Sequence, residues 1–234
     1  MTRSTFFVVN RTIMTDSLHD QLRQAYDGGA EERDSRTLAD WRLAERDHFL
    51  RQLRERRCIT LLEIGAGVGR DAQYFADHGC DVTCIDLSSE MVKRCHARGQ
   101  HALVMDVMDL SFEDGTFDAA YSVNCLLHLS KAELPLALRN IQRVLRPGGV
   151  FYYGTWGGFE HEGVYEDDHL NPPRFFSFHE DEPLLQVVGE AFEVLEFRSM
   201  NPDPTDERFR FQAFLLRKLG DTTLVTKERE TSWH

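Results

Sequence analysis

The stretch Leu61–Asp71, LLEIGAGVGRD, constrains the fold more than any other, because an apolar run leads directly into three closely spaced glycines. Glycine has no Cβ and adopts positive φ readily, so such a loop lets a ligand approach the backbone. In open α/β sheets, ligands bind at the carboxyl ends of the strands, where a loop of this kind follows a strand. The stretch therefore predicts an α/β fold with a ligand site beside Gly65, Ala66 and Gly67.

Short apolar runs alternate with amphipathic segments along most of the chain. The runs that are typical of strands cover residues 59–64, 81–85, 101–105, 117–123, 150–155, 192–198 and 209–216. Strands that alternate with helices predict a doubly wound, mostly parallel sheet with helices on both faces. We expect a single domain over residues 17–217, with a flexible leader at 1–16 before it and a polar tail at 218–234 after it.

Two helical patterns carry specific expectations. The pattern from Leu18 to about Arg57 predicts one long charged helix, an N-terminal cap over residues 17–57. Its apolar face is expected to hold Ala39, Leu43, Leu50 and Leu53. A later helix places Leu134, Leu138, Ile141 and Leu145 on one face, and we expect Pro147-Gly148-Gly149 to end it.

The charge balance and the cysteines narrow the class of protein. With 27 Lys and Arg against 39 Asp and Glu, the formal net charge is −12. Nucleic acid is therefore not expected as a partner, since its binding relies on basic contacts to phosphates. Five scattered cysteines without a CxxC pair are typical of reduced thiols in the cytoplasm. The apolar run Phe6–Val9 is too short for a signal-peptide core or a membrane span, so no membrane association is expected.

Acidic residues end three successive predicted strands. Glu63 precedes the first glycine and can accept a hydrogen bond from an ammonium group. Asp86, in CIDLS, can bind both hydroxyls of a ribose. Asp106 can accept a hydrogen bond from an adenine amino group, with the Val107 amide beside the ring. The GxGxG spacing differs from the GxGxxG of dinucleotide-binding enzymes, which disfavours a nicotinamide-dependent oxidoreductase.

Five segments together resemble the class I S-adenosylmethionine-dependent methyltransferases: EIGAGVGR, IDLS, DVMDLSFEDGTFD, SVNCLLHL and RVLRPGG. The resemblance extends over about residues 20–155. It implies a seven-stranded sheet of order 3-2-1-4-5-7-6 with the last strand antiparallel, and S-adenosyl-L-methionine as the cofactor.

The same resemblance implies roles for individual residues. The residues that match Gly65 and Gly67 pack against the cofactor, Asp86 holds the ribose, and Asp106 contacts the adenine. Asn124 matches a position that meets the methionine part, and Tyr26, in QAYD, is similar to an upstream tyrosine near the methionine carboxylate. The remaining expected contacts to the cofactor are Glu63, Ala66, Leu87, Met91 and Val107.

Residues 156–180 interrupt the alternation with a long aromatic and acidic segment, which we expect to form a lid over the acceptor. Such a mixture can close an apolar pocket and hold an amine; alternatively, the aromatic side chains pack the segment onto the sheet. The acidity predicts a neutral or cationic acceptor. The expected acceptor contacts are Trp156, Tyr165, Phe175 and Phe176.

Three histidines are weak candidates for a general base, namely His128, His161 and His169, since a structural role is the more common one for such residues. No helix-face HxxxH or paired-cysteine spacing indicates a metal site. The sequence therefore predicts methyl transfer from S-adenosylmethionine to an oxygen or nitrogen of a small molecule, for example in secondary metabolism. A non-catalytic S-adenosylmethionine-binding subunit and, less favoured, a nicotinamide-dependent oxidoreductase remain the alternatives.

Overall fold

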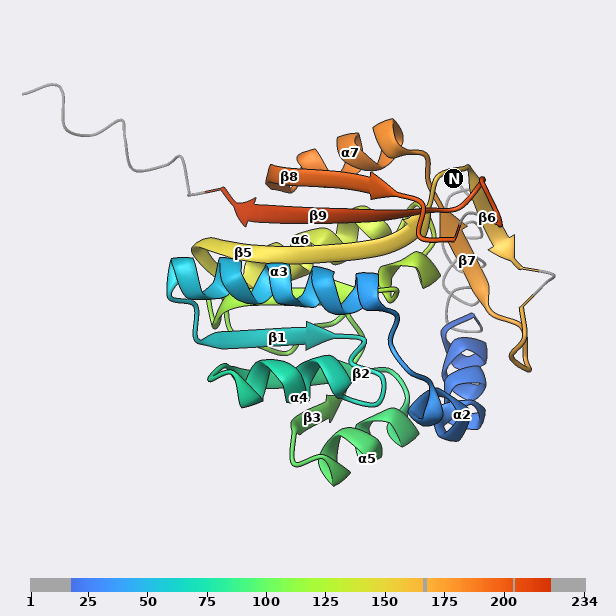
Figure 1. The fold of residues 1–234 in the computed structure, drawn as a ribbon, viewed down its shortest axis with the longest axis horizontal. Helices are drawn as coiled ribbons and strands as arrows, with labels where there is room; N and C mark the ends of the chain where they lie inside the picture. The colour runs from blue at the N-terminus through green and yellow to red at the C-terminus, as the bar shows by residue number, and fades with distance from the viewer. Residues whose placement is uncertain (1–17, 166–167, 204, 220–234) are drawn as a thin grey trace, which may run out of the picture.

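The computed structural model describes residues 18–165, 168–203 and 205–219. The predicted leader and all but residues 218 and 219 of the predicted tail lie outside the described residues. A seven-stranded sheet of order β3-β2-β1-β4-β5-β9-β8 forms the centre of the fold (Figure 1). Its strands are β1 Thr60–Ile64, β2 Asp81–Asp86, β3 His101–Val104, β4 Phe117–Val123, β5 Leu145–Gly157, β8 Phe192–Met200 and β9 Arg210–Lys218.

The direction of the strands confirms the predicted fold class. The pairs β3–β2, β2–β1, β1–β4 and β4–β5 are parallel, whereas β9 is antiparallel to both β5 and β8. Parallel strands put their carboxyl ends on one edge of the sheet, so the segments that follow β1, β2, β3 and β4 meet there.

Helices cover both faces of the sheet. The side chains on each face pack against the helices that cover it, which gives two hydrophobic cores. On one face, α3 (Asp40–Arg56), α4 (Arg70–Asp77) and α5 (Ser89–Ala97) pack against Leu61 and Tyr152. On the other face, α6 (Leu134–Val144) and α7 (Asp181–Gly189) pack against Leu62 and Phe151. The alternation of neighbouring residues between the two cores follows from the two-residue period of a strand.

The prediction of one long N-terminal helix was wrong. The segment is divided into a helix over residues 18–28, α2 (Ala30–Ser35), an irregular stretch at 36–39 and α3. Gly28 and Gly29, poor helix formers, lie at the first break. Ala39 is exposed rather than part of an apolar face, and the buried residues of α3 are Glu45, Phe49, Leu50 and Leu53.

Ion pairs and hydrogen bonds fix the N-terminal helices against α5. Asp27 accepts a hydrogen bond from the Ser88 hydroxyl at 2.5 Å, and Asp34 pairs with Arg94 at 2.9 Å and Arg98 at 2.5 Å. The end of the 18–28 helix is thereby held near the carboxyl end of β2, which brings its side chains to the ligand edge of the sheet.

The end of α6 also differs from the prediction. The helix ends at Val144, and Leu145 begins β5 instead of completing the apolar face of the helix. Pro147, Gly148 and Gly149 lie within β5, where the pairing with β4 is interrupted between Leu145 and Val150. The residues still prevent helical continuation, but they do so inside an irregular strand.

A two-stranded hairpin lies in the segment predicted to be a lid. It consists of β6 (His161–Val164) and β7 (Phe175–Phe178), paired antiparallel. Figure 1 shows the hairpin and the N-terminal helices at the same end of the sheet, the end toward which β1 runs. In the part of the chain that the structure describes, no helix is both long and apolar enough to cross a membrane.

Candidate functional site

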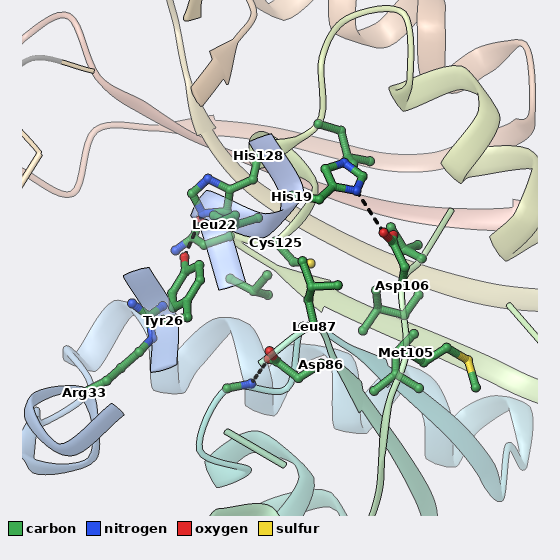
Figure 2. A pocket seen from close by; sticks show the side chains of 18 residues that line it. His19, Leu22, Tyr26, Arg33, Asp86, Leu87, Met105, Asp106, Cys125 and His128 are labelled. Atoms are coloured by element: carbon green, nitrogen blue, oxygen red, sulfur yellow. Dashed lines mark hydrogen bonds and ion pairs between the residues drawn. The ribbon is translucent and has the colours of Figure 1, made fainter. Parts of the chain in front are cut away.

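A cleft of about 710 Å³ lies at the carboxyl edge of the sheet. Its floor consists of the segments that follow β1, β2, β3 and β4, and its cover is the helix over residues 18–28 (Figure 2). Of the eleven residues predicted to bind the cofactor, eight line this cleft: Tyr26, Gly65, Gly67, Asp86, Leu87, Asp106, Val107 and Asn124.

Glycine is favoured at positions 65 and 67, at the start of the loop, for two different structural reasons. Gly65 has φ +69°, and a Cβ there would lie 2.5 Å from the side chain of Cys125, so close packing requires glycine. Gly67 has φ +55°, and the nearest atom to a Cβ there would be Arg33 Nε at 3.9 Å. The space beside Gly67 is therefore open to a ligand.

Asp86 is oriented toward the cleft by two backbone amides. Its Oδ2 accepts from Gly67 N at 2.8 Å and its Oδ1 accepts from Ser88 N at 2.9 Å. Burial raises the pKa of Asp86 despite these two hydrogen bonds. Each carboxylate oxygen keeps a lone pair, so the group can accept further hydrogen bonds from two neighbouring hydroxyls.

Asp106 follows β3 and contacts the covering helix. Its Oδ1 accepts from Met108 N at 2.9 Å, and its Oδ2 lies 2.9 Å from Nδ1 of His19 (Figure 2). Burial acts to raise the pKa of Asp106, but the hydrogen bonds from His19 and Met108 outweigh it and hold the pKa below its usual value. His19 was not predicted, because no motif surrounds it in the sequence.

Asn124 combines backbone strain with an unsatisfied polar atom. It has φ +55°, which is uncommon for a residue with a Cβ, and its backbone N–H donates to Gly154 O at 2.9 Å. Its side-chain Oδ1 is buried without a hydrogen-bond partner among the described residues. A buried acceptor that lines a cleft is suited to a ligand that donates a hydrogen bond, such as an ammonium group.

Arg33 is an unpredicted cation of the cleft. It lies on α2, and its guanidinium is 5.2 Å from the centre of the Tyr26 ring. It also lines an adjoining polar recess behind the glycine loop, together with Gly65, Gly67 and Asn124. The sequence gives no signal for Arg33, because it is one of many charged residues on the N-terminal helices.

Three residues of the predicted cofactor set lie away from the cleft. Glu63 and Ala66 line the adjoining recess, since Glu63 points to the opposite face of the sheet from Ile64. Burial raises the pKa of Glu63 well above its usual value. Met91 is fully buried beneath the loop against Ala30 and Val68, because the Ser88 cap places it in the first turn of α5.

A polar chain closes the cleft at its far end. Tyr26 Oη lies 2.7 Å from His128 Nε2, and Arg174 Nη1 donates to Tyr26 Oη at 3.0 Å. Asp168 accepts two hydrogen bonds from the Arg174 guanidinium, at 2.9 and 2.6 Å. The Arg174 contacts lower the pKa of Asp168 to about 2, despite the opposing effect of burial.

A second cavity of about 770 Å³ lies behind this row of polar side chains. Trp156, Tyr165 and Phe176, three of the four predicted acceptor contacts, line it together with Phe178 and Phe209. The fourth, Phe175, does not line it, because neighbouring residues of β7 point to opposite sides. Glu166 and Asp167 of the predicted lid lie outside the described residues.

The three candidate histidines are not brought together. His128 lies at the cofactor cleft, His169 at the second cavity, and His161 lines neither. The ring of His161 packs 5.6 Å from those of Tyr165 and Phe178. The described residues contain no group of three or more His, Cys, Asp or Glu side chains that could hold a metal ion.

Residues 62–153 match the family described as a methyltransferase domain. The chain is 33% identical over 150 residues to malonyl-[acyl-carrier protein] O-methyltransferase of Pseudescherichia vulneris, covering 61% of this chain and 58% of that protein. It is 31% identical over 157 residues to O-methyltransferase resE of Aspergillus sclerotiorum, covering 58% and 56%. The chain thus spans little more than half the length of these relatives.

A solved structure extends the likeness to the whole fold. The 1,6-didemethyltoxoflavin-N1-methyltransferase of Burkholderia thailandensis, with bound 1,6-didemethyltoxoflavin and S-adenosylhomocysteine, is 21% identical and has a TM-score of 0.61. The alignment covers 94% of this chain and 91% of that chain. Residues 62–153 are thus similar to a methyltransferase domain, and the sheet order and overall fold are similar to those of a solved methyltransferase.

Proposed function

We propose that this chain transfers the methyl group of S-adenosylmethionine to an oxygen or nitrogen atom of a small-molecule acceptor. The observation that carries the proposal is the cleft itself, in which Asp86, Asp106 and the unsatisfied Asn124 Oδ1 face one space beside an open glycine. These groups match the ribose, the adenine and the ammonium group of one ligand.

Asp86 and Asp106 would fix the nucleoside half of the cofactor. The Asp86 carboxylate, already oriented by two amides, would accept hydrogen bonds from both ribose hydroxyls. Asp106 would accept from the adenine amino group, with Leu87 and Val107 beside the ring. Because His19 contacts Asp106 in this structure, the adenine amino group would either share the Asp106 carboxylate with His19 or displace His19 from it.

Arg33 and Asn124 would fix the methionine half. Arg33 borders both the cleft and the recess behind the glycine loop, so its guanidinium can pair with the methionine carboxylate. Asn124 Oδ1 would accept from the ammonium group. The open face of Gly67 leaves room for this part of the ligand.

S-adenosylmethionine supplies an electrophilic methyl group: the acceptor atom forms the new bond to carbon while the carbon–sulfur bond breaks, and the acceptor loses a proton. The chain's contribution is alignment, which can account for much of the acceleration of such a reaction. An acceptor oxygen is favoured by the two relatives named as O-methyltransferases. The net charge of −12 supports a neutral or cationic small molecule over nucleic acid.

Calorimetric titration with S-adenosylmethionine, followed by an assay for S-adenosylhomocysteine with a panel of small hydroxylated and amine compounds, tests this function. We expect cofactor binding and acceptor-dependent product formation. Absence of cofactor binding by the folded protein would contradict the proposal, and binding without turnover across a broad panel would favour a non-catalytic subunit.

A further inference from the structure

The second cavity lies next to the cofactor cleft but has a separate lining. Leu127 belongs to the second cavity, whereas His128 and Leu129, its neighbours in the turn after β4, belong to the cleft. Arg174 lines the second cavity and donates to Tyr26, which lines the cleft. The partition between the two spaces therefore consists of Tyr26 and His128 on the side of the cleft and Arg174 on the side of the second cavity.

Aromatic side chains from four parts of the chain form the wall of this cavity. Trp156 lies next to the last residue of β5, Tyr165 follows β6, Phe176 and Phe178 lie on β7, and Phe209 precedes β9. The rings of Phe178 and Phe209 meet edge to face at 5.5 Å, as do those of Trp156 and Phe209 at 6.2 Å. Except for Phe178, which is 4% exposed, these rings are only partly buried.

Such a wall favours a flat aromatic ligand over an aliphatic one. Rings attract one another in edge-to-face and offset-stacked arrangements, beyond the effect of buried area alone. The partly exposed rings offer both faces and edges to a further ring. An aliphatic group of the same size would gain the burial but lose these oriented contacts.

The charges of the lining disfavour an anionic ligand. The Arg174 guanidinium is stacked between the rings of Tyr26 and Phe176, at 5.3 and 4.9 Å, and is paired in two places with Asp168. Its charge is thereby neutralised within the wall. Two more carboxylates, Asp203 and Asp206, line the cavity, and Arg208 pairs with Asp206. The balance of the lining is negative.

His169 also lines the cavity, and its Nε2 lies 2.8 Å from Arg36 Nη2. A guanidinium can only donate, so His169 Nε2 accepts this hydrogen bond.

We propose that this second cavity holds the ring of a planar aromatic acceptor that is neutral or positively charged. The proposal rests on the methyltransferase function proposed above and names the class of its acceptor. For methyl transfer, the nucleophilic oxygen or nitrogen of the acceptor would have to pass between the Tyr26, His128 and Arg174 side chains, which separate the two spaces in this structure, to reach the cleft.

The test uses the full chain saturated with S-adenosylhomocysteine and four probes of similar size, titrated by ligand-observed NMR. Tyramine is a cationic phenol, para-propylphenol a neutral one and para-hydroxyphenylpropionate an anionic one, while cyclohexylethylamine is cationic without an aromatic ring. We expect the first two to bind, and the anionic phenol and the cyclohexyl amine to bind at least about tenfold more weakly.

Two variants test whether the probes bind in the second cavity. Phe209→Ala should weaken the binding of tyramine and para-propylphenol, and Asp203→Asn should reduce the discrimination against the anionic phenol. Both should leave the affinity for S-adenosylhomocysteine unchanged. Glu182→Gln, an exposed acid on α7, is the matched control and should change none of these values.

The outcomes separate the two proposals. Normal binding of S-adenosylhomocysteine with no binding of the phenols, with equal binding of all four probes, or with no effect of Phe209→Ala overturns the aromatic acceptor site alone. Failure of S-adenosylhomocysteine to bind overturns the proposed function, and the acceptor assignment with it.

Discussion

The hydroxyl oxygen of Tyr26 lies 2.7 Å from Nε2 of His128, although 102 positions separate the two residues in the chain. On the other side of the ring, His128 Nδ1 lies 2.8 Å from the carbonyl oxygen of Phe175. A carbonyl can only accept, so Nδ1 carries the proton and Nε2 accepts from Tyr26. Both ring nitrogens are therefore occupied, and His128 joins the covering helix to the hairpin.

The buried state of His128 predicts a pH dependence of stability. Burial lowers the pKa of His128 to about 3 from an ordinary value near 6.5. Below pH 6.5 the unfolded chain takes up a proton that the folded chain excludes. The free energy of unfolding should therefore fall with decreasing pH, by up to about 1.4 kcal/mol per pH unit from this residue.

Urea unfolding between pH 6.5 and about 4.5 measures this slope, a range that lies above the ordinary Asp pKa. Burial also lowers the pKa of His179, which adds to the slope in the same direction. His128→Gln should make the slope shallower, whereas His101→Gln, at an exposed position on β3, should not. An unchanged slope in His128→Gln would show that His128 is protonated in the folded protein.

Gly67→Ala should abolish most of the cofactor affinity. A Cβ at this position would project into the open space that we assign to the cofactor, and the φ of +55° adds backbone strain of about 1–2 kcal/mol. Gly99→Ala is the matched control, because Gly99 has φ +75° and an added Cβ would meet nothing within 4 Å. Both variants should lose stability to a similar extent, but calorimetry should show a loss of S-adenosylmethionine binding only for Gly67→Ala.

Asp86→Asn should weaken cofactor binding by about 10- to 150-fold, equivalent to about 1.5–3 kcal/mol for lost charge-assisted hydrogen bonds. The side-chain amide that replaces the carboxylate also points its NH2 group at a backbone N–H, either that of Gly67 or that of Ser88, so one of these two hydrogen bonds is lost. Asp109→Asn, at an exposed position after β3, should bind S-adenosylmethionine as the unaltered protein does. Equal affinities for both variants would remove Asp86 from the cofactor site.

Arg174→Lys should destabilise the protein by about 1.5–3 kcal/mol, although the charge is conserved. Lysine cannot donate to Asp168 in two places while also reaching Tyr26, so a carboxylate whose side chain is 2% exposed loses hydrogen bonds. The control is Arg208→Lys, because Arg208 pairs with Asp206 at the surface and little change is expected there. Thermal unfolding of the two variants compares the effects directly.

The regular part of the sheet was predictable because its pattern is local. The apolar run Leu61–Ile64 and the glycines after it specify a strand and a turn without reference to the rest of the chain, and Asp86 follows from the next run in the same way. The break between α2 and α3 was missed, since the pattern of apolar residues continues across the irregular stretch at 36–39.

The contributions of Arg33 and Arg174 could not be predicted, because they depend on packing between distant segments. Nothing near Arg33 in the sequence distinguishes it from the other arginines of the N-terminal helices, and only the docking of α2 brings it to the glycine loop. The same holds for the hairpin. The pairing of β6 with β7 buries Phe178 but leaves Phe176 at the cavity, which a count of aromatic residues cannot show.

The linings of the cleft and of the second cavity occupy different stretches of the chain, and this division has an evolutionary consequence. The cleft uses residues from His19 to Leu129, the cavity residues from Leu127 to Phe209, and the two stretches overlap only at the turn after β4. Mutations or insertions after that turn can alter which compound is bound while the segments that face the cofactor are inherited unchanged. With the acceptor bound in the second cavity as proposed, a chimera that joins residues 1–129 of this chain to the later segment of a relative would exchange acceptor preference in a single recombination event.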